Sequence, residues 1–83
     1  MILENKENTL KRLKIRSWRR GTKEMDLILG NFADDNLDSL SSHELETYDQ
    51  FLNENDNDLY DWCSKKNKAP MEYKALITRI MSN

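Results

Sequence analysis

The chain has 83 residues, of which 37% are hydrophobic and 34% charged, with two glycines, one proline and one cysteine. A chain of this length buries only about 60% of the surface that its unfolded form exposes, so we expect one small domain over residues 1–83. No apolar run reaches the ~18 residues of a membrane span, few glycines and prolines disfavour a turn-rich β fold, and a lone cysteine excludes an internal disulfide and a CxxC pair.

Charge is distributed unevenly along the chain. Residues 1–23 contain eight Lys or Arg against two Glu, a net charge of +6, whereas residues 24–83 contain five bases against thirteen acids, a net charge of −8. This asymmetry suggests two kinds of partner: nucleic acid, or a protein with an acidic or anion-binding surface. The N-terminal stretch has no secretory h-region and carries acids that a transit peptide lacks, so we predict a soluble, cytoplasmic protein.

The first predicted helix spans roughly residues 10–19 and is basic, with an irregular apolar face. Gly21 is expected to end it, because glycine accepts the positive φ that closes many helices. Thr22 can then cap a second helix, in whose first turn Glu24 and Asp26 are favoured by the helix dipole.

The second helix has the clearest periodicity in the chain, with apolar side chains at i, i+3, i+4 and i+7. They are Met25, Ile28, Leu29 and Phe32. Gly30 lies within this helix at some cost in helix propensity and suggests close packing against a neighbour. In the connection that follows, Leu37 and Leu40 are expected to fill the core.

Three further helices are predicted in the second half of the chain. Ser41 and Glu44 have the spacing of a capping box, Asp56 or Asp58 is expected to cap the fourth helix, and Pro70 suits the first turn of the last. Their apolar positions are Leu45, Tyr48, Phe51, Leu52, Leu59, Trp62, Cys63, Tyr73, Leu76, Ile77 and Ile80. The predicted fold class is all-α, a compact single-domain bundle of about five short helices.

The sequence lacks the residues that most catalytic and metal sites require. Two glycines cannot form a GxGxxG or Walker loop, and His43 is expected to be exposed and without a catalytic or metal-binding role. Cys63 is expected to be a small core residue rather than a nucleophile. The acidic run over residues 53–58 lacks the glycine and the terminal glutamate of a calcium loop. We therefore predict a protein that is not an enzyme and holds neither a metal nor a cofactor of its own.

The segment RRGTKEMD, residues 19–26, which we call the corner, allows two interpretations. In one, its glycine and charges simply end one helix and begin the next, each charge contributing about 0.3–1 kcal/mol. In the other, the corner holds an arginine and a glutamate side by side and outward, so that they bind a partner's polar groups. Trp18 beside it could serve either the core or a binding surface.

The corner carries the RGxxE signature of the succinate dehydrogenase flavinylation factors, the family that includes mitochondrial succinate dehydrogenase assembly factor 2. The chain resembles the bacterial branch of that family in RSWRRGTKEMDLILGNFADDNLDSL and in DLYDWC, and the likeness covers roughly residues 12–80. It implies a helical assembly factor, expected to be a monomer, that binds the flavoprotein subunit of succinate dehydrogenase, and in some bacteria that of fumarate reductase. Such a factor promotes covalent attachment of FAD to a histidine of the partner.

The resemblance also implies which residues bind the partner. The motif positions are Arg20, Gly21 and Glu24, and the further candidates around them are Trp18, Arg19, Lys23 and Asp26. Whether Arg16 belongs to the same surface stays open.

Two other binding roles stay open beside this one. The basic segment LKRLKIRSWRR could contact phosphates of nucleic acid without reading sequence. The chain could also be the antitoxin of a toxin–antitoxin pair, which would bind a protein and involve no flavin.

Overall fold

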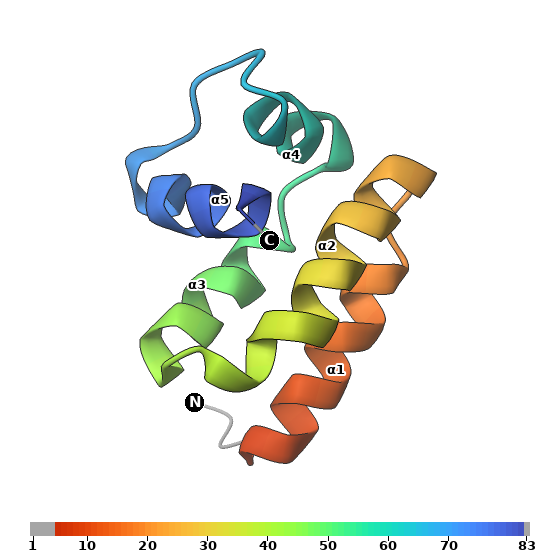
Figure 1. Ribbon diagram of the computed structural model, residues 1–83, viewed down its shortest axis with the longest axis vertical. Coiled ribbons are helices and arrows are strands. Elements are labelled where there is room, and N and C mark those ends of the chain that lie inside the picture. The colour runs from red at the N-terminus through yellow and green to blue at the C-terminus, as the bar shows by residue number, and fades with distance from the viewer. Residues whose placement is uncertain (1–4, 83) are drawn as a thin grey trace.

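The computed structural model describes residues 5–82, and all regular structure in that range is helical. Five α-helices and two 3₁₀ turns follow in chain order: α1 (Lys6–Trp18), α2 (Lys23–Asn36), η1 (Leu37–Ser39), α3 (Ser42–Phe51), α4 (Asp56–Cys63), η2 (Met71–Tyr73) and α5 (Lys74–Met81). Helices α1 and α2 form a long antiparallel pair, and α3, α4 and α5 lie to one side of it (Figure 1). The predicted all-α fold of five short helices is confirmed, while residues 1–4 and 83 of the predicted domain lie outside the described residues.

Polar side chains define where the helices begin. Thr22 accepts a hydrogen bond from the third backbone N–H of α2, and Ser41 and Glu44 form the reciprocal capping box of α3, as predicted. Helix α1 starts at Lys6, four residues before its predicted start, because the Asn5 side chain caps it.

Two helix starts differ from the predictions. Helix α4 is capped by Asn55, whose side chain accepts from the Asp58 N–H, so neither Asp56 nor Asp58 is the cap. Asparagine caps as well as aspartate does, and the sequence offers both in succession. Pro70 precedes the η2 turn, and α5 itself begins only at Lys74.

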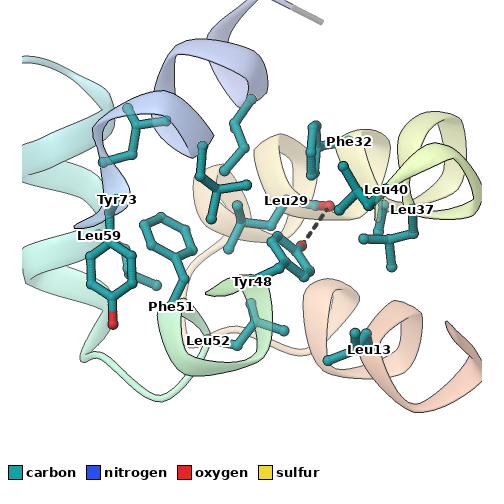
Figure 2. Packing of buried hydrophobic residues seen from close by; sticks show 14 of the residues in the cluster. Leu13, Leu29, Phe32, Leu37, Leu40, Tyr48, Phe51, Leu52, Leu59 and Tyr73 are labelled. Atoms are coloured by element: carbon teal, nitrogen blue, oxygen red, sulfur yellow. Dashed lines mark hydrogen bonds between the residues drawn. The ribbon is translucent and has the colours of Figure 1, made fainter. Parts of the chain in front are cut away.

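A chain of aromatic rings runs through the core (Figure 2). Tyr48 of α3 lies between Phe32 and Phe51, with ring centroids 5.6 and 6.4 Å apart, and Phe51 meets the Tyr73 ring edge-on at 5.2 Å. The buried aliphatic residues around them are Leu13, Met25, Leu29, Leu37, Leu40, Leu45, Leu52, Leu59, Leu76, Ile77 and Ile80. The predicted apolar stripes are thus confirmed as core, with Ile28 and Trp62 packed against it and only partly buried.

One polar pair lies inside this core. The Ser17 hydroxyl donates to the Leu13 carbonyl oxygen at 2.7 Å and accepts from the Tyr48 hydroxyl, which also lies 3.5 Å from the Leu29 carbonyl oxygen (Figure 2). Burial raises the pKa of Tyr48 to about 12, so the phenol keeps its proton and remains a donor. The pair joins α1 to α3 in the one place where α1 buries a polar side chain among the described residues.

A second connection between α1 and α3 is ionic. The Arg12 guanidinium contacts both carboxylate oxygens of Asp49, at 3.1 and 3.2 Å, and Arg16 donates to the same carboxylate at 2.6 Å and to the Asn53 side chain at 2.8 Å. Arg16 therefore stabilises the fold from a position that the sequence left undecided. The hydrogen bonds from Arg12, helped by the charges of both arginines, lower the pKa of Asp49 below its ordinary 3.8 against the opposing effect of burial.

We predict that Asp49→Asn lowers the free energy of unfolding at pH 7 by about 1 kcal/mol, the upper range for partly exposed ion pairs. Because the folded pKa is depressed, the carboxylate stabilises the protein above pH 3.8 and loses this effect as pH falls through its folded pKa. The difference between wild type and variant in urea unfolding should therefore shrink below pH 3.8. The matched control is Glu46→Gln, an exposed acid of the same helix, which should change stability by less than about 0.5 kcal/mol. A difference for Asp49→Asn that is equal at pH 7 and pH 3 would contradict the prediction.

Candidate functional site

The corner connects α1 to α2 without a left-handed residue. Helix α1 ends at Trp18, and Arg19 follows it with φ −121° and ψ 49°. Neither glycine has a positive φ, and Lys65, in the loop after α4, is the positive-φ residue of the described chain. The prediction that Gly21 ends the helix through a positive φ is therefore wrong.

Arg20 points into the protein rather than toward solvent. Its side chain is only 12% exposed, and Nε donates to the Asp56 carboxylate at 2.8 Å. The other two guanidinium nitrogens donate to the backbone carbonyl oxygens of Leu52 at 2.7 Å and Glu54 at 3.0 Å. Its own backbone N–H donates to the Asp26 carboxylate. The hypothesis of an outward Arg20–Glu24 pair is thus not supported for the arginine, because the turn between α3 and α4 offers its guanidinium three acceptors.

Gly21 allows a close approach of the Asp56 carboxylate to the backbone. Its backbone N–H donates to the second oxygen of the Asp56 carboxylate, Oδ2, at 2.5 Å. A Cβ atom at this position would lie 2.6 Å from that oxygen, closer than real Cβ contacts come. A side chain here would therefore force the Asp56 carboxylate to shift, which would disturb its hydrogen bond with the Gly21 N–H.

The surface of the corner is formed by its other residues. Arg19, Thr22, Lys23 and Glu24 are exposed, with Glu24 in the first turn of α2. Next to Glu24 a shallow hollow of about 340 Å³ separates the start of α2 from α4. It is lined by Thr22, Glu24, Asp56, Asn57, Tyr60 and Asp61. Tyr60 is 45% exposed, so the hollow brings the exposed Glu24 carboxylate of the corner and an aromatic ring of α4 to one surface.

Trp18 packs onto α2 and leaves its outer part in contact with solvent. A Cβ atom on Gly30 would overlap the indole ring, so the predicted close packing at Gly30 is confirmed and its neighbour is Trp18. The indole N–H lies 3.2 Å from the Asp34 carboxylate, and the residue is 37% exposed. Asp26, half-buried, is directed toward the Arg20 backbone.

The sequence interpretation missed the residues that hold the corner from the other side. Asp56 was expected to be a helix cap, and the carbonyl oxygens of Leu52 and Glu54 carry no sequence signal at all. The Glu54 side chain accepts a hydrogen bond from the Tyr73 hydroxyl at 3.0 Å, which connects the same turn to η2. The acid-rich segment at the start of α4 indicates that a cation could bind there, but nothing in it indicates that this cation is Arg20, 36 positions earlier in the chain.

Cys63 and His43, the other candidates for chemistry, lie away from the corner. Cys63 is buried, and burial raises the pKa of its thiol to about 11, so it is a core residue as predicted. His43 is exposed beside a hollow of about 160 Å³ between α3 and α5, in which Glu44 and Arg79 bind each other at 2.9 Å. Within residues 5–82, no three His, Cys, Asp or Glu side chains are grouped so that they could hold a metal ion. No helix in that range has the length and apolar character needed to cross a membrane.

Comparison with known proteins identifies similar chains. The family model described as the flavinator of succinate dehydrogenase matches residues 11–83. The protein named succinate dehydrogenase assembly factor 2, mitochondrial, of Schizosaccharomyces pombe is 43% identical over 72 residues, which cover 87% of this chain and 52% of the relative. The protein of the same name in Meyerozyma guilliermondii is 47% identical over 62 residues, which cover 75% of this chain and 46% of the relative. The one in Arabidopsis thaliana is 33% identical over 86 residues, which cover 96% of this chain and 46% of the relative. The chain thus spans about half the length of the curated relatives it matches.

These relatives correct one prediction. A cytoplasmic bacterial protein was expected, whereas the similar curated proteins are named mitochondrial and come from eukaryotes. The expectation rested on the likeness to the bacterial branch and on the first residues of the chain, the first four of which lie outside the described residues. Because the chain matches only about half of its relatives' length, its first residues are no guide to targeting.

We predict that Arg20→Lys lowers the free energy of unfolding by about 2 kcal/mol, since an ammonium group cannot reach all three acceptors and hydrogen bonds to charged groups are worth about 1.5–3 kcal/mol. The matched control is Arg19→Lys, the same substitution at the exposed neighbour, with an expected change below about 0.5 kcal/mol. Urea unfolding followed by circular dichroism measures both. Equal unfolding midpoints for the two variants would contradict the inward role of Arg20.

Proposed function

This chain belongs to the family described as the flavinator of succinate dehydrogenase, and we propose that it promotes covalent attachment of FAD to the flavoprotein subunit of that enzyme. The single structural observation that carries the proposal is the corner itself, in which Arg20 and Gly21 are both bound to Asp56 and the Glu24 side chain is left exposed. The names of the similar assembly factors support the choice of partner.

The proposed mechanism assigns the chemistry to the partner. Covalent flavinylation joins a flavin ring to a protein side chain, and the cofactor supplies most of the reactivity. The assembly factor has only to hold the flavoprotein subunit in a conformation that aligns flavin and acceptor. It needs no catalytic group of its own and no FAD site of its own.

Glu24 is the residue of the motif best placed to contact the partner. An exposed carboxylate in the first turn of a helix accepts hydrogen bonds from donors on a facing protein. Its backbone lies in the helical turn that the Thr22 side chain caps by accepting from the Met25 N–H, so little backbone entropy is lost when the partner binds. Arg19 and Lys23 add positive charge beside it, which favours a partner with acidic groups at the rim of the contact.

The geometry of α1 favours this protein-binding role over nucleic-acid binding. Bases of the helix form ion pairs with acids of the same protein, which reduces the positive potential that phosphates would meet. These pairs are Lys11–Glu7 at 3.5 Å, Arg12–Asp49 at 3.1 Å, Lys14–Asp38 at 3.8 Å and Arg16–Asp49 at 2.6 Å. No observation on the molecule favours the antitoxin hypothesis.

The test is to express the cognate flavoprotein subunit with and without this chain and to read covalent flavin as in-gel fluorescence after denaturation. We expect a flavin band that depends on the chain and that falls at least tenfold with Glu24→Gln, because the amide cannot replace the carboxylate as an acceptor of charge-assisted hydrogen bonds. Glu46→Gln, an exposed acid on α3, should leave the band unchanged. A band of equal strength without the chain would reject the proposed function, and a full band with Glu24→Gln would reject the role of this residue.

A further inference from the structure

Asp56 makes two hydrogen bonds that its position in α4 does not require. It is the first residue of that helix, but Asn55 already provides the cap. Both oxygens of its carboxylate are directed instead to the corner, Oδ1 accepting from Arg20 Nε at 2.8 Å and Oδ2 from the Gly21 N–H at 2.5 Å. Its side chain is 24% exposed, and its bond to Arg20 is partly buried whereas its bond to the Gly21 N–H is exposed to water.

The shape of the corner matches this carboxylate. A Cβ atom on Gly21 would lie 2.6 Å from Oδ2 and 3.7 Å from Cγ of Asp56. Since Gly21 has no positive φ, its backbone does not require glycine, and the crowding comes from Asp56 alone. Glycine at position 21 and aspartate at position 56 are therefore a matched pair: a side chain at position 21 would fit only if the side chain at position 56 were smaller.

The same carboxylate fixes how two exposed surfaces lie relative to each other. Glu24 lies in the first turn of α2, three residues after Gly21, and Tyr60 lies one turn after Asp56 in α4. Both side chains line the hollow between α2 and α4. The hydrogen bonds of Asp56 thus connect the start of α4 to Arg20 and Gly21, which directly precede the Thr22 cap of α2.

We propose that Asp56 is a positioning residue of the partner-binding corner: it holds Arg20 and Gly21 so that Glu24 and Tyr60 form one docking surface for the flavoprotein subunit. The inference rests on the proposed function, because it assumes that the corner meets that partner. Asp56 itself faces the corner and acts on the partner through Glu24.

The first measurement is direct and uses the free protein. In Asp56→Ala the Gly21 amide loses its acceptor, so its hydrogen exchange, followed by NMR at pH 7, should become at least tenfold faster. Asp58→Ala, which removes an exposed acid from the same first turn, should leave the exchange within twofold of wild type. Unchanged exchange in Asp56→Ala would overturn the proposal.

The second measurement is the dissociation constant of the complex with the flavoprotein subunit, at a temperature where circular dichroism shows every variant folded. We expect binding to weaken at least tenfold in Asp56→Ala and less than twofold in Asp58→Ala. Gly21→Ala should weaken binding at least tenfold in the wild-type background but less than twofold further in Asp56→Ala, because the oxygen that its methyl group would strike is then gone. Independent, multiplying losses would overturn the matched pair.

The two proposals fail in different ways. If Glu24→Gln abolishes binding and Asp56→Ala does not, the positioning role is wrong and the proposed function stands. If the wild-type chain does not bind the flavoprotein subunit at all, the proposed function falls and the inference falls with it. If binding depends on Asp56 but covalent flavin does not depend on the chain, the docking surface is right and the flavinylation role is wrong.

Discussion

The contact between the Arg20 guanidinium and the turn that joins α3 to α4 organises the surface of this protein. One side chain reaches the carbonyl oxygens of Leu52 and Glu54 and the carboxylate of Asp56. The Leu52 carbonyl at the end of α3 has no partner within the helix, and the Glu54 carbonyl lies in the turn beyond it, so the cation binds acceptors that the helix leaves unpaired. Because Arg20 lies between α1 and α2, the same contact holds the helix pair against the rest of the bundle.

The core continues this connection on its apolar side. Phe51, next to the residue whose carbonyl oxygen Arg20 binds, packs against Tyr48 and Tyr73. The Tyr73 hydroxyl in turn donates to the Glu54 side chain. The turn between α3 and α4 is thus held by rings from within and by hydrogen bonds from both neighbouring segments. A small domain buries little surface, so packing alone contributes little to fixing a surface loop. Here packing and polar contacts together keep the loop in one conformation.

Sequence patterns predicted most of the fold and only the outline of the site. Apolar side chains at helical spacing located the core of α2 and α5, and the Thr22 and Ser41 caps located two helix starts, because these signals act over a few neighbouring residues. The direction of Arg20 depends on acceptors more than 30 positions away, and a single long-range polar contact leaves no periodicity. Gly21 illustrates the same limit. A positive φ and a close approach both select glycine, so the residue type alone could not distinguish them.

The three motif residues of the corner therefore have two different roles. Two of them stabilise the turn, and the third is exposed and available to a partner. Arg20 and Gly21 are committed to Asp56, whereas the Glu24 side chain is exposed. Loss of activity on changing Arg20 would not show that it touches a partner, since the change also loosens the turn behind it. Changing Glu24 leaves those internal hydrogen bonds in place. Measuring both stability and binding on the same variants therefore distinguishes the two roles. A change at a residue that stabilises the turn should alter the free energy of unfolding and the affinity for the partner, whereas a change at an exposed contact residue should alter only the affinity.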